Sequence, residues 1–96
     1  MAKTGLKANI NGRVQGVYFR KYTQKKARNL NLQGWVQNEA DGSVNLEAFG
    51  DETDIEKLKA WLKKGPVLAR VENADINTIP YEEYTDFIIQ KPTTQA

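Results

Sequence analysis

Residues 6–14 read LKANINGRV, and residues 19–30 read FRKYTQKKARNL. Apolar and polar residues alternate in the first stretch, which is the period of a half-buried β-strand. In the second stretch, apolar residues recur every three or four positions among lysines and arginines, which predicts an amphipathic helix over about 19–31. Gly12 and Gly16 interrupt the strand pattern, so a short glycine-containing loop is expected between the two elements.

The middle of the chain predicts a β-hairpin followed by a second helix. Residues 34–50 contain two strand-like stretches on either side of the turn-forming pair Asp41-Gly42. The helix is expected to begin at Thr53, which with Glu56 matches a capping box. It is expected to end at Gly65-Pro66, after a lysine-rich last turn.

The remainder predicts two more strands, over 69–79 and 85–90, and a loose tail over 91–96. The order of elements is therefore β-α-β-β-α-β, with an extra terminal strand. This is the ferredoxin-like α+β arrangement, in which both helices cover one face of a mostly antiparallel sheet. A chain of 96 residues predicts a single domain, residues 1–96. Because this fold hosts many functions, the function has to be argued from the site.

Composition excludes several kinds of chemistry. The chain has no histidine and no cysteine, so it offers no imidazole base, no thiolate and none of the usual zinc or iron–sulfur ligands. An enzyme of this composition relies on arginine, lysine, asparagine, carboxylates, hydroxyls and backbone amides. Without cysteine, a signal-peptide pattern or an apolar stretch of about 20 residues, the sequence predicts a cytoplasmic protein with no membrane segment.

Charge is divided unevenly along the chain. The first 38 residues carry eight lysines and arginines and no acid. The remaining residues carry six bases and all twelve acids, a net charge of −6, so the whole chain sums to +2. This division fits either a basic helix followed by acidic loops or a positive field that attracts an anionic ligand.

The loop before the first helix has the features of an anion site. A helix N-terminus leaves backbone N–H groups unpaired and carries a partial positive charge, yet residues 14–19 contain none of the usual capping side chains. Gly16 can adopt the positive φ that turns successive amides toward one point. Arg20 would lie in the first helical turn, where a bound phosphate would offset its unfavourable position. The alternative is a surface arginine beside a glycine turn.

Two motifs resemble those of the acylphosphatase family. The first runs from Val14 to Arg20 and reads VQGVYFR, and the second is GWVQN over 34–38, continuing to DGSV over 41–44. Shorter similarities occur at Gly65-Pro66, at Ala69-Arg70-Val71 and at Phe87-Ile88-Ile89, so the resemblance spans about residues 5–90. Tyr18 departs from the smaller residue that the family often has there, and this difference bears on the width of the pocket.

The resemblance implies a ferredoxin-like enzyme that needs no metal and no organic cofactor. It implies that Arg20 binds a phosphoryl group and that Asn38 orients the attacking water. The phosphate-binding loop would comprise Gln15, Gly16, Val17, Tyr18, Phe19 and Arg20. The predicted reaction is hydrolysis of the carboxyl–phosphate bond of a small acyl phosphate, releasing inorganic phosphate, by a monomer with no nucleic-acid partner.

Two other functions remain open at this point. The fold and the basic first half of the chain permit a nucleic-acid-binding module, although residues 44–49, VNLEAF, lack the stacked aromatics of an RNA-recognition strand. The chain could also be a phosphate sensor or interaction unit, since similar domains occur inside larger proteins such as hydrogenase-maturation factors.

Overall fold

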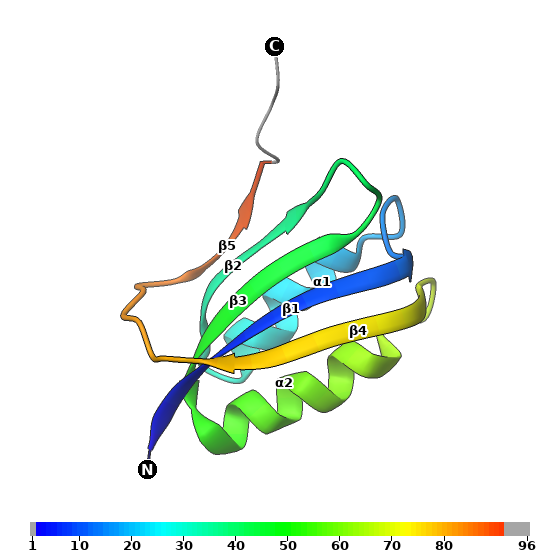
Figure 1. The fold of residues 1–96 in the computed structure, drawn as a ribbon. Helices are drawn as coiled ribbons and strands as arrows, with labels where there is room; N and C mark the ends of the chain where they lie inside the picture. Colours follow the sequence, from blue (N-terminus) through cyan, green and yellow to red (C-terminus); the bar gives the residue numbers. More distant parts are fainter. Residues whose placement is uncertain (1, 92–96) are drawn as a thin grey trace.

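The computed structural model describes residues 2–91 and contains a five-stranded sheet and two helices. The elements follow one another in the predicted order, including the extra terminal strand (Figure 1). They are β1 (Lys3–Arg13), α1 (Phe19–Asn29), β2 (Gln33–Asn38), β3 (Val44–Asp51), α2 (Glu52–Lys64), β4 (Arg70–Ile79) and β5 (Phe87–Gln90).

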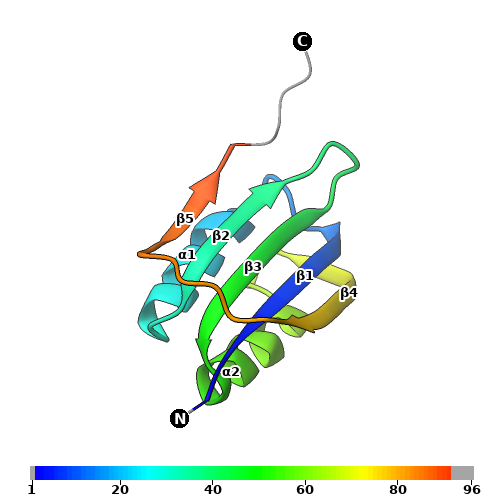
Figure 2. The same ribbon diagram turned by 60° about the vertical axis from the view of Figure 1, so that its left-hand side comes forward.

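The sheet has the order β4-β1-β3-β2-β5. Neighbouring strands are antiparallel except for β2 and β5, which run parallel with Gly34 opposite Phe87. Both helices lie on the same face of the sheet, with α1 over β2 and β5 and α2 over β4, β1 and β3 (Figure 1 and Figure 2). The ferredoxin-like α+β arrangement predicted from the sequence is confirmed.

The core lies between the sheet and the two helices. Alternate side chains of β1 and β3 point into it, because successive residues of a strand face opposite sides. The helices contribute side chains spaced three or four residues apart, as their apolar stripes predict. The buried members of these four elements are Leu6, Ala8, Ile10, Phe19, Ala27, Val44, Leu46, Ala48, Ile55, Leu58 and Leu62.

The predicted capping box at the start of α2 is wrong. The helix begins at Glu52, directly after β3, and Asp51 is its N-cap with no side-chain hydrogen bond. Thr53 therefore lies inside the first turn. The Glu52 N–H donates to the Ala2 carbonyl at 3.0 Å, so the residue before β1 satisfies an amide that a side chain would otherwise cap.

The segment between β4 and β5 crosses from one edge of the sheet to the other (Figure 2). On the face away from the helices, Phe49 stacks on Tyr84 with ring centroids 5.2 Å apart and meets Tyr81 edge-on at 6.3 Å. These contacts hold the crossing segment against the sheet. From residue 92 onward, the predicted loose tail lies outside the described residues.

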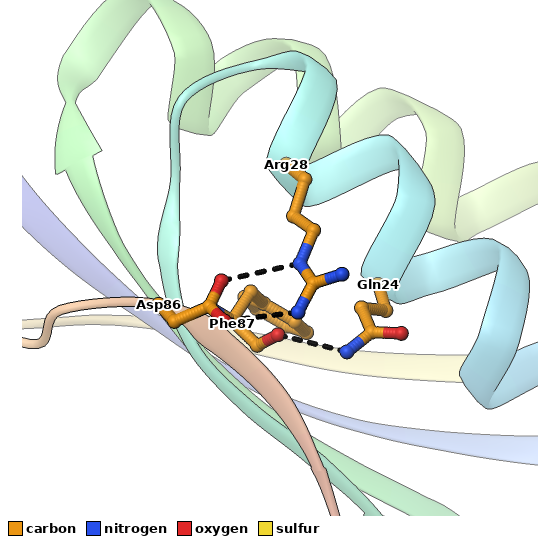
Figure 3. Close-up of polar contacts among 4 residues, drawn as sticks. All are labelled: Gln24, Arg28, Asp86 and Phe87. Carbon is orange, nitrogen blue, oxygen red and sulfur yellow. Dashed lines mark hydrogen bonds and ion pairs between the residues drawn. The ribbon is translucent and has the colours of Figure 1, made fainter.

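Edge strand β5 is also tied to α1 by side chains (Figure 3). Arg28 donates two hydrogen bonds to the Asp86 carboxylate, at 3.1 and 2.9 Å. One turn earlier, the Gln24 amide donates to the Phe87 carbonyl at 2.9 Å. The pKa of Asp86 is lowered chiefly by the bonds from Arg28 and also by the Phe87 N–H. These bonds hold a four-residue strand that has only one strand neighbour.

Candidate active site

The loop between β1 and α1 combines two residues of positive φ. Gly16 has φ 75°, and Tyr18, the N-cap of α1, has φ 62° and ψ 24°. A non-glycine residue in this left-handed region costs about 1–2 kcal/mol. The Tyr18 carbonyl accepts the first helical hydrogen bond, from the Tyr22 N–H at 3.0 Å. The chain thus turns sharply at Tyr18, directly before the first residue of α1.

The start of α1 has no side-chain cap, as its sequence predicts. Tyr18 makes no capping hydrogen bond, and the first turn contains no acidic residue. Arg20 lies in that turn, where its positive charge is unfavourable next to the positive end of the helix dipole. Unpaired amides and a cation at the same point favour a bound anion.

A cavity of about 380 Å³ opens at this helix start. It brings together residues from the loop, from α1, from the end of β2 and from β5. Its walls carry two cations and no acidic side chain. The lining residues are Val14, Gln15, Gly16, Tyr18, Phe19, Arg20, Lys21, Asn38 and Ile89.

This cavity is lined by most of the residues that the sequence analysis predicted for the site. Arg20 and Asn38, 18 positions apart in the chain, both do so. Val17 does not, because its side chain turns into the core and is only 5% exposed. Tyr18, by contrast, lines the cavity and is 66% exposed.

Asn38 carries an unsatisfied polar atom. It is the last residue of β2 and lies opposite Val44 of β3. Its Oδ1 is buried and accepts no hydrogen bond from any described residue. A buried acceptor without a partner costs about 1–3 kcal/mol, so this oxygen is suited to bind a proton of a water or ligand in the cavity.

The turn after Asn38 is held by its own side chains. The Asp41 carboxylate accepts the Ser43 hydroxyl at 2.6 Å and the Ser43 N–H at 2.9 Å. These two bonds, the hydroxyl first, lower the pKa of Asp41. Gln15 of the loop donates two further hydrogen bonds to the backbone of the same turn. The predicted turn at Asp41-Gly42 is therefore a well-ordered support for Asn38.

Three lining residues, Val14, Lys21 and Ile89, lie outside the site predicted from the sequence. The position of Lys21 beside Arg20 in the first turn of α1 was a signal that it belongs to the site. Ile89 reaches the cavity because β5 pairs in parallel with β2. No local pattern in the sequence indicates that pairing.

Across residues 2–91, histidine, cysteine, aspartate and glutamate side chains nowhere gather in a group of three or more that could hold a metal ion. Neither α1 nor α2 is long and apolar enough to cross a membrane.

Comparison with known proteins agrees with the motifs. The acylphosphatase family model matches residues 6–89. An acylphosphatase of Pseudomonas paraeruginosa is 40% identical over 91 residues, which are 95% of this chain and 100% of that protein. The structure of an acylphosphatase from Coxiella burnetii matches with a TM-score of 0.88 at 41% identity, over 92% of this chain and 93% of that one. The crystal structure of acylphosphatase from Bacillus subtilis matches with a TM-score of 0.87 at 31% identity, over 91% of this chain and 98% of that one. By sequence and by fold, then, the chain belongs to the acylphosphatase family.

Proposed function

We propose that this protein hydrolyses the carboxyl–phosphate bond of small acyl phosphates in the cavity at the start of α1. The observation that carries the proposal is that Arg20 and Asn38 line one cavity at an uncapped helix N-terminus. The names of the acylphosphatase relatives support the same reaction. The products are a carboxylate and inorganic phosphate.

Arg20 and the loop amides bind the phosphoryl group in this mechanism. The backbone N–H groups of Gln15–Phe19 and the dipole of α1 meet its oxygens, and the guanidinium binds two of them at once. Charge builds up on the equatorial oxygens in the loose transition state of phosphoryl transfer. Donors fixed in place before the reaction stabilise that charge without reorganisation. Lys21 adds a second positive charge to the cavity wall.

Asn38 orients the attacking water. Its buried Oδ1 accepts a hydrogen bond from the water, so that the water oxygen faces the phosphorus. The new bond forms between the water oxygen and phosphorus, and the bond from phosphorus to the carboxyl oxygen breaks. The carboxylate leaves with the electron pair and needs little acid assistance. The water proton passes to a phosphate oxygen, because an amide is not a base.

The acyl group occupies the outer part of the cavity. Tyr18 and Ile89 are the partly exposed apolar residues on its wall, so an apolar acyl group packs against them. The large side chain at position 18 narrows the mouth of the cavity.

The reaction needs no metal or organic cofactor in this proposal, because the transition state is stabilised by Arg20 and backbone amides. Treatment with EDTA should therefore leave activity unchanged, and a requirement for Mg²⁺ would contradict this part of the proposal. We also propose that the protein is a cytoplasmic monomer without a nucleic-acid partner. Light scattering after gel filtration should then give a mass near 10.9 kDa.

The test is hydrolysis of benzoyl phosphate by the wild type and by Arg20→Ala. We expect the variant to lose about 10²-fold or more in kcat/KM and to bind inorganic phosphate more weakly. Lys25→Ala is the matched control, since it removes one exposed positive charge of the same helix outside the cavity. Circular dichroism shows whether each variant is folded. A folded but inactive wild type would refute the hydrolase, and equal losses in both variants would refute the specific role of Arg20.

A further inference from the structure

The side chain of Gln15 bridges the two halves of the candidate active site. Its Nε2 donates to the Glu39 carbonyl and to the Ser43 carbonyl, both at 2.8 Å. Gln15 lies in the loop before α1, whereas both acceptors lie in the turn between β2 and β3, 24 and 28 residues further along the chain. One amide group thus joins the loop to the hairpin, and both of its hydrogens are used.

The two acceptors lie at the base of the turn that follows Asn38. The Glu39 N–H donates to the Ser43 carbonyl at 2.9 Å, and the Gly42 N–H donates to the Glu39 carbonyl at 3.1 Å. The last residue pair of the β2–β3 ladder is Asn38 with Val44. The carbonyls held by Gln15 are therefore those of the residues immediately beyond that pair, Glu39 and Ser43.

We infer that Gln15 is a positioning residue: its side chain sets the separation between the phosphate loop and the amide of Asn38. This inference rests on the proposed function, in which Arg20 and the loop hold phosphate while Asn38 holds water. The loop backbone carries the phosphate donors, and the turn carries the neighbour of Asn38. Any shift of the turn relative to the loop changes the path of the water toward phosphorus, and positional errors of this kind lower the rate strongly.

The chemistry of the bridge requires glutamine. Two carbonyl acceptors face one group, so that group has to supply two N–H donors. Methionine has a similar length and no donor, whereas a glutamate carboxylate would face the two carbonyls with acceptors only. Gln15→Met therefore removes the bonds while keeping most of the side-chain volume.

The experiment is a double-mutant cycle with benzoyl phosphate. Gln15→Met is made in the wild type and in Asn38→Ala, and kcat, KM and inhibition by inorganic phosphate are measured. We expect Gln15→Met to lower kcat about tenfold in the wild type, the size expected for losing one to two net hydrogen bonds. In the Asn38→Ala background the same change should lower kcat less than about twofold. Phosphate inhibition should be unchanged in both backgrounds.

Gln24→Met is the matched control. Like Gln15→Met, it removes a hydrogen bond from a glutamine amide to a backbone carbonyl. In this case the bond joins Gln24 of α1 to the Phe87 carbonyl of β5 at 2.9 Å, and Gln24 does not line the cavity. Its kcat should stay close to that of the wild type. Any one of three results would overturn the inference. Gln24→Met and Gln15→Met could lower kcat equally, Gln15→Met could lower kcat equally in both backgrounds, or Gln15→Met could weaken inhibition by phosphate.

Failure of the proposed function would look different. An inactive wild type, or an Asn38→Ala variant with full activity, would refute the hydrolase or the water-orienting role before Gln15 is considered. Circular dichroism at the assay temperature establishes that each variant is folded. Where Gln15→Met does not fold, Gln15→Leu, which also removes both donors and adds no charge, serves in the same cycle with the same expected pattern.

Discussion

Asn38 shows how a single atom can indicate chemistry. By its place in the chain it is a turn residue, whose amide would ordinarily satisfy local backbone groups. In the structure its Oδ1 is buried and has no partner among the described residues. It lines the same cavity as Arg20, which lies at an uncapped helix start. A buried, unpaired acceptor beside an anion site is the arrangement that a bound water would complete.

Replacement of Asn38 by alanine should therefore separate turnover from phosphate binding. We expect kcat for benzoyl phosphate to fall about 10²-fold, the size typical of losing one positioned polar group. Inhibition by inorganic phosphate should change little, because the phosphate donors are Arg20 and the loop. Unchanged kcat in a folded Asn38→Ala variant would rule out the water-orienting role.

Among the elements, β5 is held by hydrogen bonds from α1 side chains as well as by its backbone pairing with β2. It is a four-residue edge strand, and its contacts to α1 include the Arg28–Asp86 pair and the Gln24 bond (Figure 3). The ion pair is bidentate but exposed, with Arg28 and Asp86 about 50% and 52% accessible. Exposed pairs stabilise proteins only modestly. The pair is therefore expected to set the position of β5 more than the overall stability.

The pH dependence of this pair has a definite sign. The folded protein lowers the pKa of Asp86 below its ordinary value of 3.8, so the unfolded chain binds the proton more tightly. The stabilisation is present above about pH 4 and is lost as the pH falls through the folded pKa. Arg28→Ala should lower Tm at pH 7 by no more than about 5 °C.

Thermal melts of the wild type and Arg28→Ala between pH 7 and pH 2 test this prediction. The difference between the two proteins should shrink as the pH falls, because protonated Asp86 no longer pairs with the guanidinium. Lys25→Ala, which removes another cation of α1, gives the comparison for a change in charge alone. A difference in Tm that grows toward acid pH would contradict the assignment.

The contact between β2 and β3 depends on a residue without a side chain. Gly34 has φ 141°, and a Cβ placed on it would lie 2.0 Å from the Glu47 carbonyl oxygen. A clash with backbone cannot be relieved by rotating a side chain. The pairing that carries Asn38 to the cavity therefore needs glycine at this position.

Gly34→Ala should lower the free energy of unfolding by about 3–5 kcal/mol, through overpacking and an unfavourable φ together. Gly42→Ala is the control, because Gly42 has φ 93° and no atom lies within 4 Å of its Cβ position. The free energy of unfolding of that variant should fall by only about 1–2 kcal/mol. Urea denaturation measures both, and similar losses in the two variants would show that the close contact is unimportant.

Over the whole molecule, charge follows the architecture. The basic first 38 residues form β1, α1, β2 and the loops between them, and they supply all of the cavity lining except Ile89. The acidic remainder forms β3, α2, β4 and β5. In the proposed reaction, the positive part of the molecule therefore surrounds the site that receives an anionic substrate. Such a field raises the rate of encounter with substrate and is screened by salt.

The value of kcat/KM should accordingly fall with ionic strength, by about threefold or more between 20 and 300 mM salt. Most of the change should appear in KM, because the reacting groups inside the cavity are less exposed to screening. A variant with Lys25→Gln and Lys26→Gln should have a lower kcat/KM at low salt and a shallower salt dependence. A KM independent of salt in both proteins would argue against a role for the field.

Local patterns in the sequence were enough to identify the elements and one half of the candidate site. Strand alternation in β1, the apolar stripe of α1 and the turn at Asp41-Gly42 each depend on neighbours in the chain, so periodicity and turn chemistry report them. The uncapped start of α1 could be predicted for the same reason. The capping box at Thr53 failed because a partner outside the segment, the Ala2 carbonyl, satisfies the start of α2.

Packing between distant segments decided the rest. Strand register brings Asn38 to the cavity that Arg20 lines, parallel pairing brings Ile89 there, and the bond from Gln15 to the hairpin joins residues 24 and 28 positions apart. None of these contacts produces a periodic pattern in the nearby sequence, because each depends on how the sheet is ordered and how α1 packs on it. The sequence alone therefore indicated an anion-binding loop and, through the family resemblance, named Asn38 as its partner. The tertiary structure decided which side chains line one cavity.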